Sequence, residues 1–185
     1  SRRGFITNYP HFQHWKNVDL IDSELNKPLN IYIHIPFCMQ RCAYCYYRTT
    51  VSKGKDRVQH LDRYIDAVCK EIEIVSNKYQ FKKRSINSIY FGGGTPTVLN
   101  EKHFRQLIDS LQKHLTIESP EFTVEAEPVT LTQKKADLLK ELSVNRISLG
   151  VQSLCNDVIK RADRLDTEKD ALKAMDRAMN TGASV

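Results

Sequence analysis

The sequence lacks any apolar run of the roughly 20 residues that a membrane-spanning helix needs. Its N-terminal segment, rich in arginine, histidine and aromatic residues, also lacks the apolar core of a secretion signal. Basic residues form only short clusters, at 53–57 and 82–84, without the long basic run and interleaved aromatics that favour nucleic-acid binding. We therefore expect a cytoplasmic protein whose net charge of +6 reflects a solvated surface, with a small molecule rather than nucleic acid or membrane as its partner.

Cysteines are also few, and their placement excludes a disulfide framework. Three of the five fall within eight residues, as Cys38, Cys42 and Cys45, while Cys69 and Cys155 stand alone. A local group of this kind indicates metal binding in a reducing compartment. The two isolated cysteines are interpreted as ordinary buried thiols.

The 185 residues suffice for one folding unit with a real core. Short apolar runs alternate with stretches of helical periodicity, which predicts a parallel sheet with helical crossovers. We expect residues 1–30 to form an N-terminal extension and residues 31–185 a βα domain that is incomplete at its C-terminus. The expected strands are 31–37, 86–91, 122–127 and 146–152, and the expected helices are 61–79, 101–115, 132–142 and further segments to about residue 180.

One face of several predicted strands is polar. In the first strand, Ile31, Ile33 and Ile35 alternate with Tyr32 and His34, and a period of two places the two sets on opposite faces. Strands buried on both faces would read as continuous apolar runs, so a polar ligand or lumen is expected on one side. The fold class is therefore α/β, as a partial (βα) barrel with parallel strands and outer helices, and its site should lie at the C-terminal strand ends. Four strands cannot close a barrel, so more strands are expected beyond this sequence.

The three clustered cysteines have the spacing C-x3-C-x2-C and directly follow the first predicted strand. Three thiolates can hold three irons of a 4Fe-4S cubane, which normally takes four, and the fourth iron is then open to another ligand. A zinc site completed by His34 or His103 is the alternative, although zinc motifs more often use C-x2-C pairs. Cys155 is a further candidate for a fourth ligand.

Two other groups of residues indicate ligand binding at the same edge. Gly92, Gly93 and Gly94 end the second predicted strand, where glycines allow the backbone to approach a ligand closely. The Gly-Lys-Ser/Thr ending of a phosphate loop is absent. The second group consists of polar residues predicted on lumen faces, Glu125, Glu127 and Gln152. Polar side chains inside a protein need hydrogen-bond partners, and binding the amino group or the ribose of a ligand would provide them.

The residues resemble a known family, the radical S-adenosylmethionine (SAM) proteins, and within it the oxygen-independent coproporphyrinogen III oxidase-like group. Four stretches in the same order carry the resemblance, which covers nearly the whole chain. They are Tyr32-Ile33-His34-Ile35-Pro36-Phe37-Cys38, Phe91-Gly92-Gly93-Gly94-Thr95-Pro96-Thr97, Val124-Glu125-Ala126-Glu127-Pro128 and Asn145-Arg146-Ile147-Ser148-Leu149-Gly150-Val151-Gln152-Ser153.

The resemblance implies a role for each matching residue. Cys38, Cys42 and Cys45 would ligate a 4Fe-4S cluster, and the methionine part of S-adenosylmethionine would chelate the open iron. Tyr32 would face the reacting centre, and Tyr44 would pack against the adenine. The remaining cofactor contacts implied are Gly92, Gly93, Gly94, Thr95, Glu125, Gln152 and Arg164.

The resemblance also implies an activity, in which electron transfer from the reduced cluster cleaves S-adenosylmethionine to methionine and a 5'-deoxyadenosyl radical. In the oxidase branch this radical takes a hydrogen from a propionate of coproporphyrinogen III in porphyrin and haem biosynthesis, and loss of an electron and carbon dioxide leaves a vinyl group. Arg146 and Arg164 are expected to pair with propionates or with the cofactor carboxylate. A tetrapyrrole substrate and an electron donor such as flavodoxin or ferredoxin are the implied partners.

One departure bears on the branch of the family. The oxidases, as the resemblance has it, carry a further cysteine two places after the third cluster ligand, where this chain has Tyr47. The alternatives are a haem chaperone of the same family or a radical SAM methyltransferase on another substrate.

Overall fold

A computed structural model describes residues 27–51, 54 and 56–185, so that most of the expected extension, residues 1–26, lies outside the described residues. Four parallel strands form the main sheet in the order β1-β4-β5-β6, and the short strands β2 and β3 pair separately. The strands are β1 (Leu29–Ile35), β2 (Phe37–Cys38), β3 (Thr50–Val51), β4 (Ile86–Gly93), β5 (Glu121–Ala126) and β6 (Arg146–Leu149).

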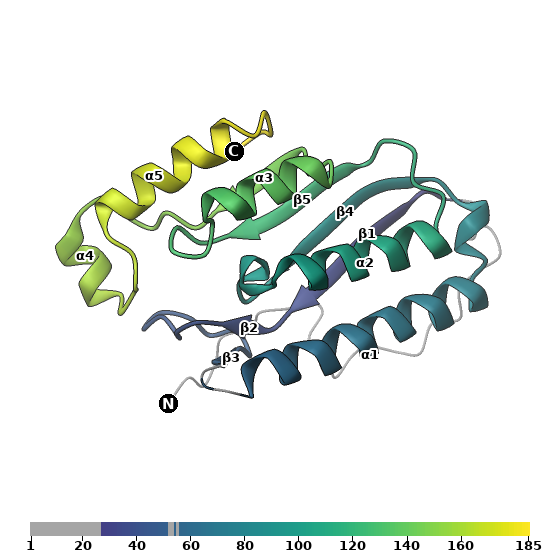
Figure 1. Cartoon of the computed structure of the whole chain (residues 1–185), viewed down its shortest axis with the longest axis horizontal. Helices are drawn as coiled ribbons and strands as arrows, with labels where there is room; N and C mark the ends of the chain where they lie inside the picture. The colour runs from purple at the N-terminus through teal and green to yellow at the C-terminus, as the bar shows by residue number, and fades with distance from the viewer. Residues whose placement is uncertain (1–26, 52–53, 55) are drawn as a thin grey trace, which may run out of the picture.

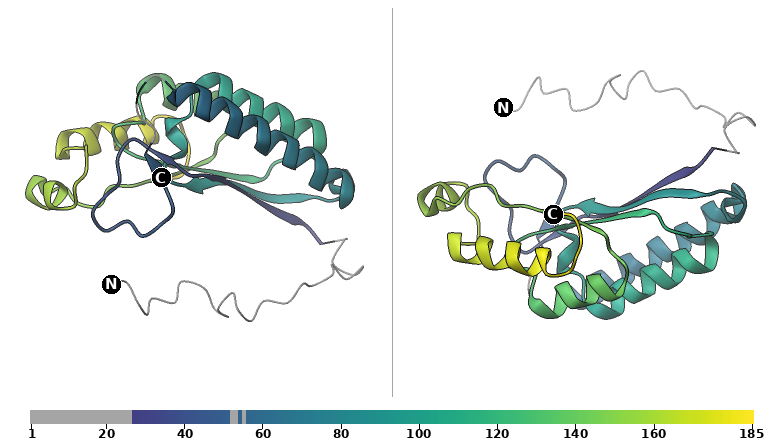
Figure 2. Two further views of the ribbon diagram at one scale, coloured as in Figure 1. Left: turned by 90° about the horizontal axis from the view of Figure 1, so that it is seen from below. Right: turned by 90° about the horizontal axis from the view of Figure 1, so that it is seen from above.

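The α-helices cover one face of this sheet and leave the other face open (Figures 1 and 2). Each crossover between neighbouring strands contains a helix, as the alternating sequence pattern predicts. The helices are α1 (Arg57–Lys78), α2 (Glu101–His114), α3 (Gln133–Glu141), α4 (Asn156–Arg161) and α5 (Glu168–Met179), with 3-10 turns η3 (Phe81–Lys83) and η4 (Pro96–Val98). No helix in the described part of the chain is long and apolar enough to cross a membrane.

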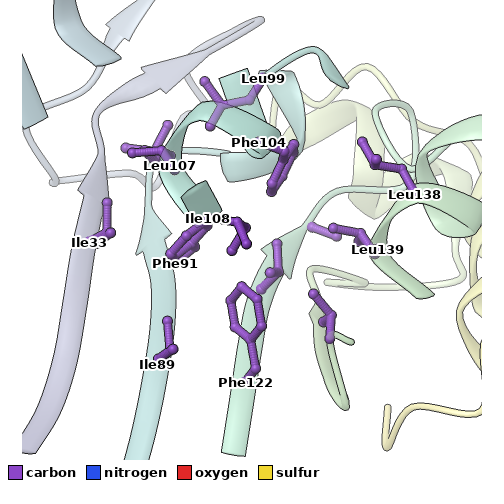
Figure 3. Close-up of a cluster of buried hydrophobic side chains, with 14 of the residues drawn as sticks. Ile33, Ile89, Phe91, Leu99, Phe104, Leu107, Ile108, Phe122, Leu138 and Leu139 are labelled. Carbon is purple, nitrogen blue, oxygen red and sulfur yellow. The ribbon is translucent and has the colours of Figure 1, made fainter. Parts of the chain in front are cut away.

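The core lies between the helices and the sheet (Figure 3). Phe91 of β4 is fully buried, with its ring 5.1 Å from that of Phe122 in edge contact and 6.2 Å from that of Phe104. This packing directs the apolar side chains of the strands toward the helices. Because side chains alternate along a β-strand, the intervening polar residues lie on the open face. The predicted α/β fold with outer helices and parallel strands is confirmed.

Two predicted strands end two or more residues earlier than expected. Pro36 has no backbone N–H, so β1 stops at Ile35 and the chain turns aside into β2, which places Cys38 on a separate two-stranded ribbon. The last strand, β6, stops at Leu149. Gly150 N still donates to Ala126 O of β5, but Val151 N donates to Leu149 O within its own segment, so the pairing with β5 ends there. Gln152 therefore lies in the loop after β6 rather than on the strand.

Candidate functional site

The three clustered cysteines line one cavity of about 250 Å³ at the carboxyl ends of the strands. Most of the predicted cofactor residues line the same cavity. The shared lining comprises Cys38, Cys42, Cys45, Tyr44, Gly93, Gly94, Thr95, Glu125 and Gln152, together with Glu127, Ser148 and Gly150.

The loop that carries the cysteines is anchored to a turn far away in the sequence. Ala43 N donates to Ala162 O at 2.9 Å, and Gln40 Nε2 donates to both the backbone and the side-chain oxygen of Asp163, at 2.7 and 2.9 Å. Asp163 adopts a positive φ of 53°, a conformation that few residues other than glycine take. The turn after α4 therefore fixes the middle of the cysteine loop.

The glycine-rich end of β4 packs directly against this loop. Gly94 N donates to Ile35 O at 2.8 Å, and a Cβ at position 94 would lie only 2.9 Å from Cys38 Sγ. Thr95 Oγ1 donates to the same sulfur at 3.5 Å. Gly93 has a φ of 116°, and a Cβ there would lie 2.6 Å from the His34 ring. The strand end can approach the cysteines only because it has no side chains here.

Glu125 presents its carboxylate to the cavity and is held from β4. Tyr90 Oη donates to Oε1 at 2.7 Å, and Gly93 N donates to Oε2 at 2.9 Å. Burial first, and then the bond to Glu125, raise the pKa of Tyr90 to about 12, so this phenol stays protonated at neutral pH. The sequence reading missed Tyr90, although its position one residue before core residue Phe91 predicts the open face.

Arg164 differs from its predicted place. Its side chain is only 1% exposed and lies behind the cavity rather than in its lining. The guanidinium donates to Asp166 Oδ1 at 2.8 Å, to Gly150 O at 2.7 Å and to Tyr44 Oη at 3.0 Å, and it lies 3.5 Å from Glu127. Arg164 therefore orients Tyr44 and the Gly150 backbone, and its expected contact with the cofactor or with a substrate propionate stays a prediction.

Three further predicted residues lie at the margin of the site. Tyr32 is 57% exposed on the open face, stacks on Tyr90 with centroids 5.8 Å apart and shares a hydrogen bond of 2.9 Å with His34 Nδ1. Gly92 lies beside Tyr90 outside the cavity lining. Arg146 Nη1 reaches Glu121 and Thr123 at 3.4 Å, on the open face but nearer the start of the strands.

The alternative zinc ligands are engaged elsewhere. His103 is fully buried in α2, where Nε2 contacts Asp62 Oδ1 at 3.0 Å and Nδ1 accepts from Asn100 N at 3.4 Å. Within the described residues, no three His, Cys, Asp or Glu side chains converge on one metal-ion position. Cys155 is exposed at the start of α4 and does not line the cavity, which corrects its expected burial.

The side chains that line the cavity suit a cubane cluster with an adjoining ligand. A cubane requires one thiolate at each of three separate irons, and three thiols around a shared space meet that requirement without converging on a point. Burial is the main cause that raises the pKa of the Cys38 and Cys42 thiols, so cluster binding must displace their protons. Beside the thiols, the Glu125 carboxylate and the Gln152 amide offer hydrogen-bond partners for a polar ligand.

The fold and this site define a partial βα barrel with a three-cysteine loop at the carboxyl ends of its strands. Residues 32–185 match the family model of the radical SAM superfamily. The chain therefore belongs to the radical SAM superfamily, whose cofactors are a 4Fe-4S cluster and S-adenosylmethionine, as the sequence reading predicted.

Individual relatives include both a chaperone and an oxidase. The chain is 36% identical over 153 residues to the heme chaperone HemW of Bacillus subtilis, covering 82% of this chain and 39% of that protein. It is 34% identical over 154 residues to the oxygen-independent coproporphyrinogen III oxidase of Pseudomonas aeruginosa, covering 82% of this chain and 33% of that protein. The chain thus spans well under half the length of these relatives.

Among solved structures, the chain is similar to the radical SAM coproporphyrinogen III oxidase HemN of Escherichia coli. The TM-score is 0.82 at 26% identity, over 96% of this chain and 42% of that one. A structure described as native anSMEcpe with bound AdoMet has a TM-score of 0.52 at 20% identity, which supports the fold alone.

Proposed function

We propose that this chain is the catalytic core of an enzyme that cleaves S-adenosylmethionine reductively and directs the resulting radical to a tetrapyrrole. The observation that carries the proposal is the cavity shared by Cys38, Cys42 and Cys45 with the glycine-rich strand end and Glu125. When bound, the reduced cluster supplies one electron to the sulfonium, which yields methionine and a 5'-deoxyadenosyl radical. The free thiols on which the site depends support a cytoplasmic location.

The chain's own residues would supply position and shielding. The three cysteines would hold the cluster, and Gly93, Gly94 and Thr95 would lie along the methionine part of the cofactor. Glu125 and Gln152 would accept and donate hydrogen bonds at its polar groups, as their places in the cavity wall allow. Tyr44, held by Arg164, would cover the adenine. Tyr32, exposed on the open face, would then meet the substrate.

For the substrate step, the first candidate is oxidative decarboxylation of coproporphyrinogen III propionates, an oxidoreductase activity. Likeness to two oxidases named for this activity supports it. The second candidate is a haem chaperone. Tyr47, where the oxidases were expected to carry a cysteine, favours this second candidate, as do several relatives of that name.

The test uses the full-length protein with its cluster reconstituted anaerobically. Given dithionite and S-adenosylmethionine, it should form 5'-deoxyadenosine, and no product from a fully loaded cluster would refute the common proposal. Added coproporphyrinogen III should yield vinyl products if the oxidase candidate is correct. Stoichiometric haem uptake without porphyrinogen oxidation would establish the chaperone instead. Methyl transfer without either outcome would indicate a methyltransferase.

The proposed electron donor, a flavodoxin or ferredoxin, would approach on the helix side of the cysteine loop. There a cavity of about 380 Å³ is lined by Met39, next in sequence to Cys38, and by the cations Arg57, Lys134 and Lys135. Glu101 is the single acidic residue of this lining. The excess positive charge of this lining suits a donor with an acidic surface. A donor bound there would lie beside Met39 and so close to the proposed cluster ligand Cys38.

A further inference from the structure

Tyr90 donates a hydrogen bond to the carboxylate of Glu125, which lines the cavity. Both oxygens of Glu125 accept a hydrogen bond from β4, Oε1 from Tyr90 Oη at 2.7 Å and Oε2 from Gly93 N at 2.9 Å. A carboxylate with one donor on each oxygen cannot rotate without breaking a bond. Each oxygen retains a further lone pair for a donor in the cavity.

The phenol itself is held in place by its neighbours. A Cβ at Gly92 would lie 2.7 Å from Tyr90 Cε1 and 3.1 Å from Glu125 Cδ, so the ring and the carboxylate both occupy space that only a glycine leaves. Tyr32 stacks on the Tyr90 ring at 5.8 Å with an interplanar angle of 29°. Glu125 lines the cavity, whereas Tyr90 stands outside its lining. Tyr90 therefore acts on the cavity through neighbours in its wall, chiefly Glu125, which accepts its hydrogen bond, and also Ser148, which interacts with the phenol.

We propose that Tyr90 is a positioning residue, which fixes Glu125 for a hydrogen-bond donor of S-adenosylmethionine, either its ammonium or a ribose hydroxyl. The inference rests on the proposed function, in which Glu125 contacts that cofactor. Without the phenol, the Glu125 carboxylate loses one of the two hydrogen bonds that hold it. Affinity for the cofactor should then fall. Cluster binding and the chemical step should be unaffected, because the residues proposed for them are unaltered.

The test is Tyr90→Phe in the full-length, anaerobically reconstituted protein, with dithionite as reductant. Because a hydrogen bond to a charged group is lost while the ring remains, the KM for S-adenosylmethionine should rise about tenfold. Turnover to 5'-deoxyadenosine at saturation should stay within about threefold, and iron, sulfide and thermal midpoint should remain unchanged. Tyr64→Phe is the matched control: it removes a phenol that donates to His34 O at 2.8 Å, and it should leave this KM unchanged.

A double-mutant cycle separates positioning from a general structural effect. In a Glu125→Gln background, Tyr90→Phe should change the KM for S-adenosylmethionine by less than about twofold, because the proposed main route of action, through the Glu125 carboxylate, is gone. Gly92→Ala, which displaces the Tyr90 ring with its hydroxyl intact, should raise the same KM. Competition by methionine and by 5'-deoxyadenosine should show which half of the cofactor is weakened.

Two results would overturn the proposal. One is an unchanged KM for S-adenosylmethionine in Tyr90→Phe. The other is a rise in that KM that Tyr90→Phe produces equally in the wild-type protein and in the Glu125→Gln background. Failure of the proposed function would give other results. The wild-type protein would then form no 5'-deoxyadenosine, or Glu125→Gln would leave the affinity for S-adenosylmethionine unaltered.

Discussion

Cys42 is held within a tight turn, because Cys45 N donates to its carbonyl oxygen at 3.1 Å. It also lines the cavity with two other thiols, so its loss leaves only two of the three proposed cluster ligands. Cys42→Ala should abolish both a stable 4Fe-4S complement and formation of 5'-deoxyadenosine, as measured by iron and sulfide analysis and by product assay. Cys155→Ala, which removes an exposed thiol outside the cavity, should retain both. Full activity in Cys42→Ala would remove the ligand assignment.

Gly93 combines a positive φ with a close neighbour. A Cβ there would lie 2.6 Å from the His34 ring, and the φ of 116° is unfavourable for any other residue. Gly93→Ala should therefore lower the free energy of unfolding by about 2 kcal/mol and weaken S-adenosylmethionine binding. Gly54→Ala tests the backbone strain alone, since Gly54 has a φ of 84° and a Cβ there would meet no atom of the described residues within 4 Å. Denaturant titration of both variants should show the larger loss at position 93.

At the scale of single elements, the turn after α4 depends on a buried ion pair. The Arg164 side chain is 1% exposed and that of Asp166 is 2% exposed, with Nε to Oδ1 at 2.8 Å. Asp166→Ala leaves a buried guanidinium without its nearest counter-charge and should cost about 3 kcal/mol in unfolding free energy. Asp157→Ala, at an exposed position of α4, should cost well under 1 kcal/mol. Equal losses would show that the pair contributes little.

Helix α3 carries a lysine whose proton affinity should appear in the pH dependence of stability. Burial first, then the nearby charges of Arg57 and Lys134, lower the pKa of Lys135 to about 8. Between that value and about 10.4, the usual lysine pKa, the unfolded chain binds more protons than the folded one, so stability rises with pH. Below pH 8 the full penalty of the buried ammonium applies.

The measurement compares Lys135→Met with the wild-type protein. The difference in unfolding free energy should favour the variant most at pH 7 and shrink steadily between pH 8 and 10. Lys140→Met, at an exposed position of the same helix, should show a constant difference. A pH-independent difference for Lys135→Met would contradict the lowered pKa.

The elements show which parts of the fold a sequence can predict. Helix and strand order followed from periodicity, and the three cysteines and the glycine-rich strand end stood out by spacing. The short ribbon of β2 and β3 was missed, because its two-residue strands carry no period. The burial of Arg164 was also missed, because Asp166, Tyr44 and Gly150 become its partners only through tertiary structure.

At the scale of the whole molecule, the cavity rich in cations and the second basic cluster lie at different places on the fold. Arg57 and Lys134 line the cavity beside Met39, whereas Lys82 and Lys83 are exposed in η3, just before β4 begins. The first pair is therefore close to the cysteine loop, and the second pair precedes the opposite end of the strands.

Removing charge from each place should separate donor docking from catalysis. In the full-length enzyme, Arg57→Gln with Lys134→Gln should raise the KM for reduced flavodoxin about tenfold and weaken its dependence on salt. The dithionite-driven rate should stay unchanged, because a small reductant needs no docking surface. Lys82→Gln with Lys83→Gln removes the same charge and should affect neither rate. Equal effects of the two pairs would refute the docking surface.

The contact between Gln40 and Asp163 has a consequence for biosynthesis, because 123 residues separate the two ends. At 5–20 residues per second, a ribosome needs roughly 6 to 25 seconds to make the intervening chain. Throughout that interval the nascent cysteine loop lacks its anchor, and its thiols are open to oxidants and stray metals. Iron–sulfur delivery should therefore succeed only after the Asp163 turn has emerged, and truncated nascent chains that end before it should acquire no stable cluster.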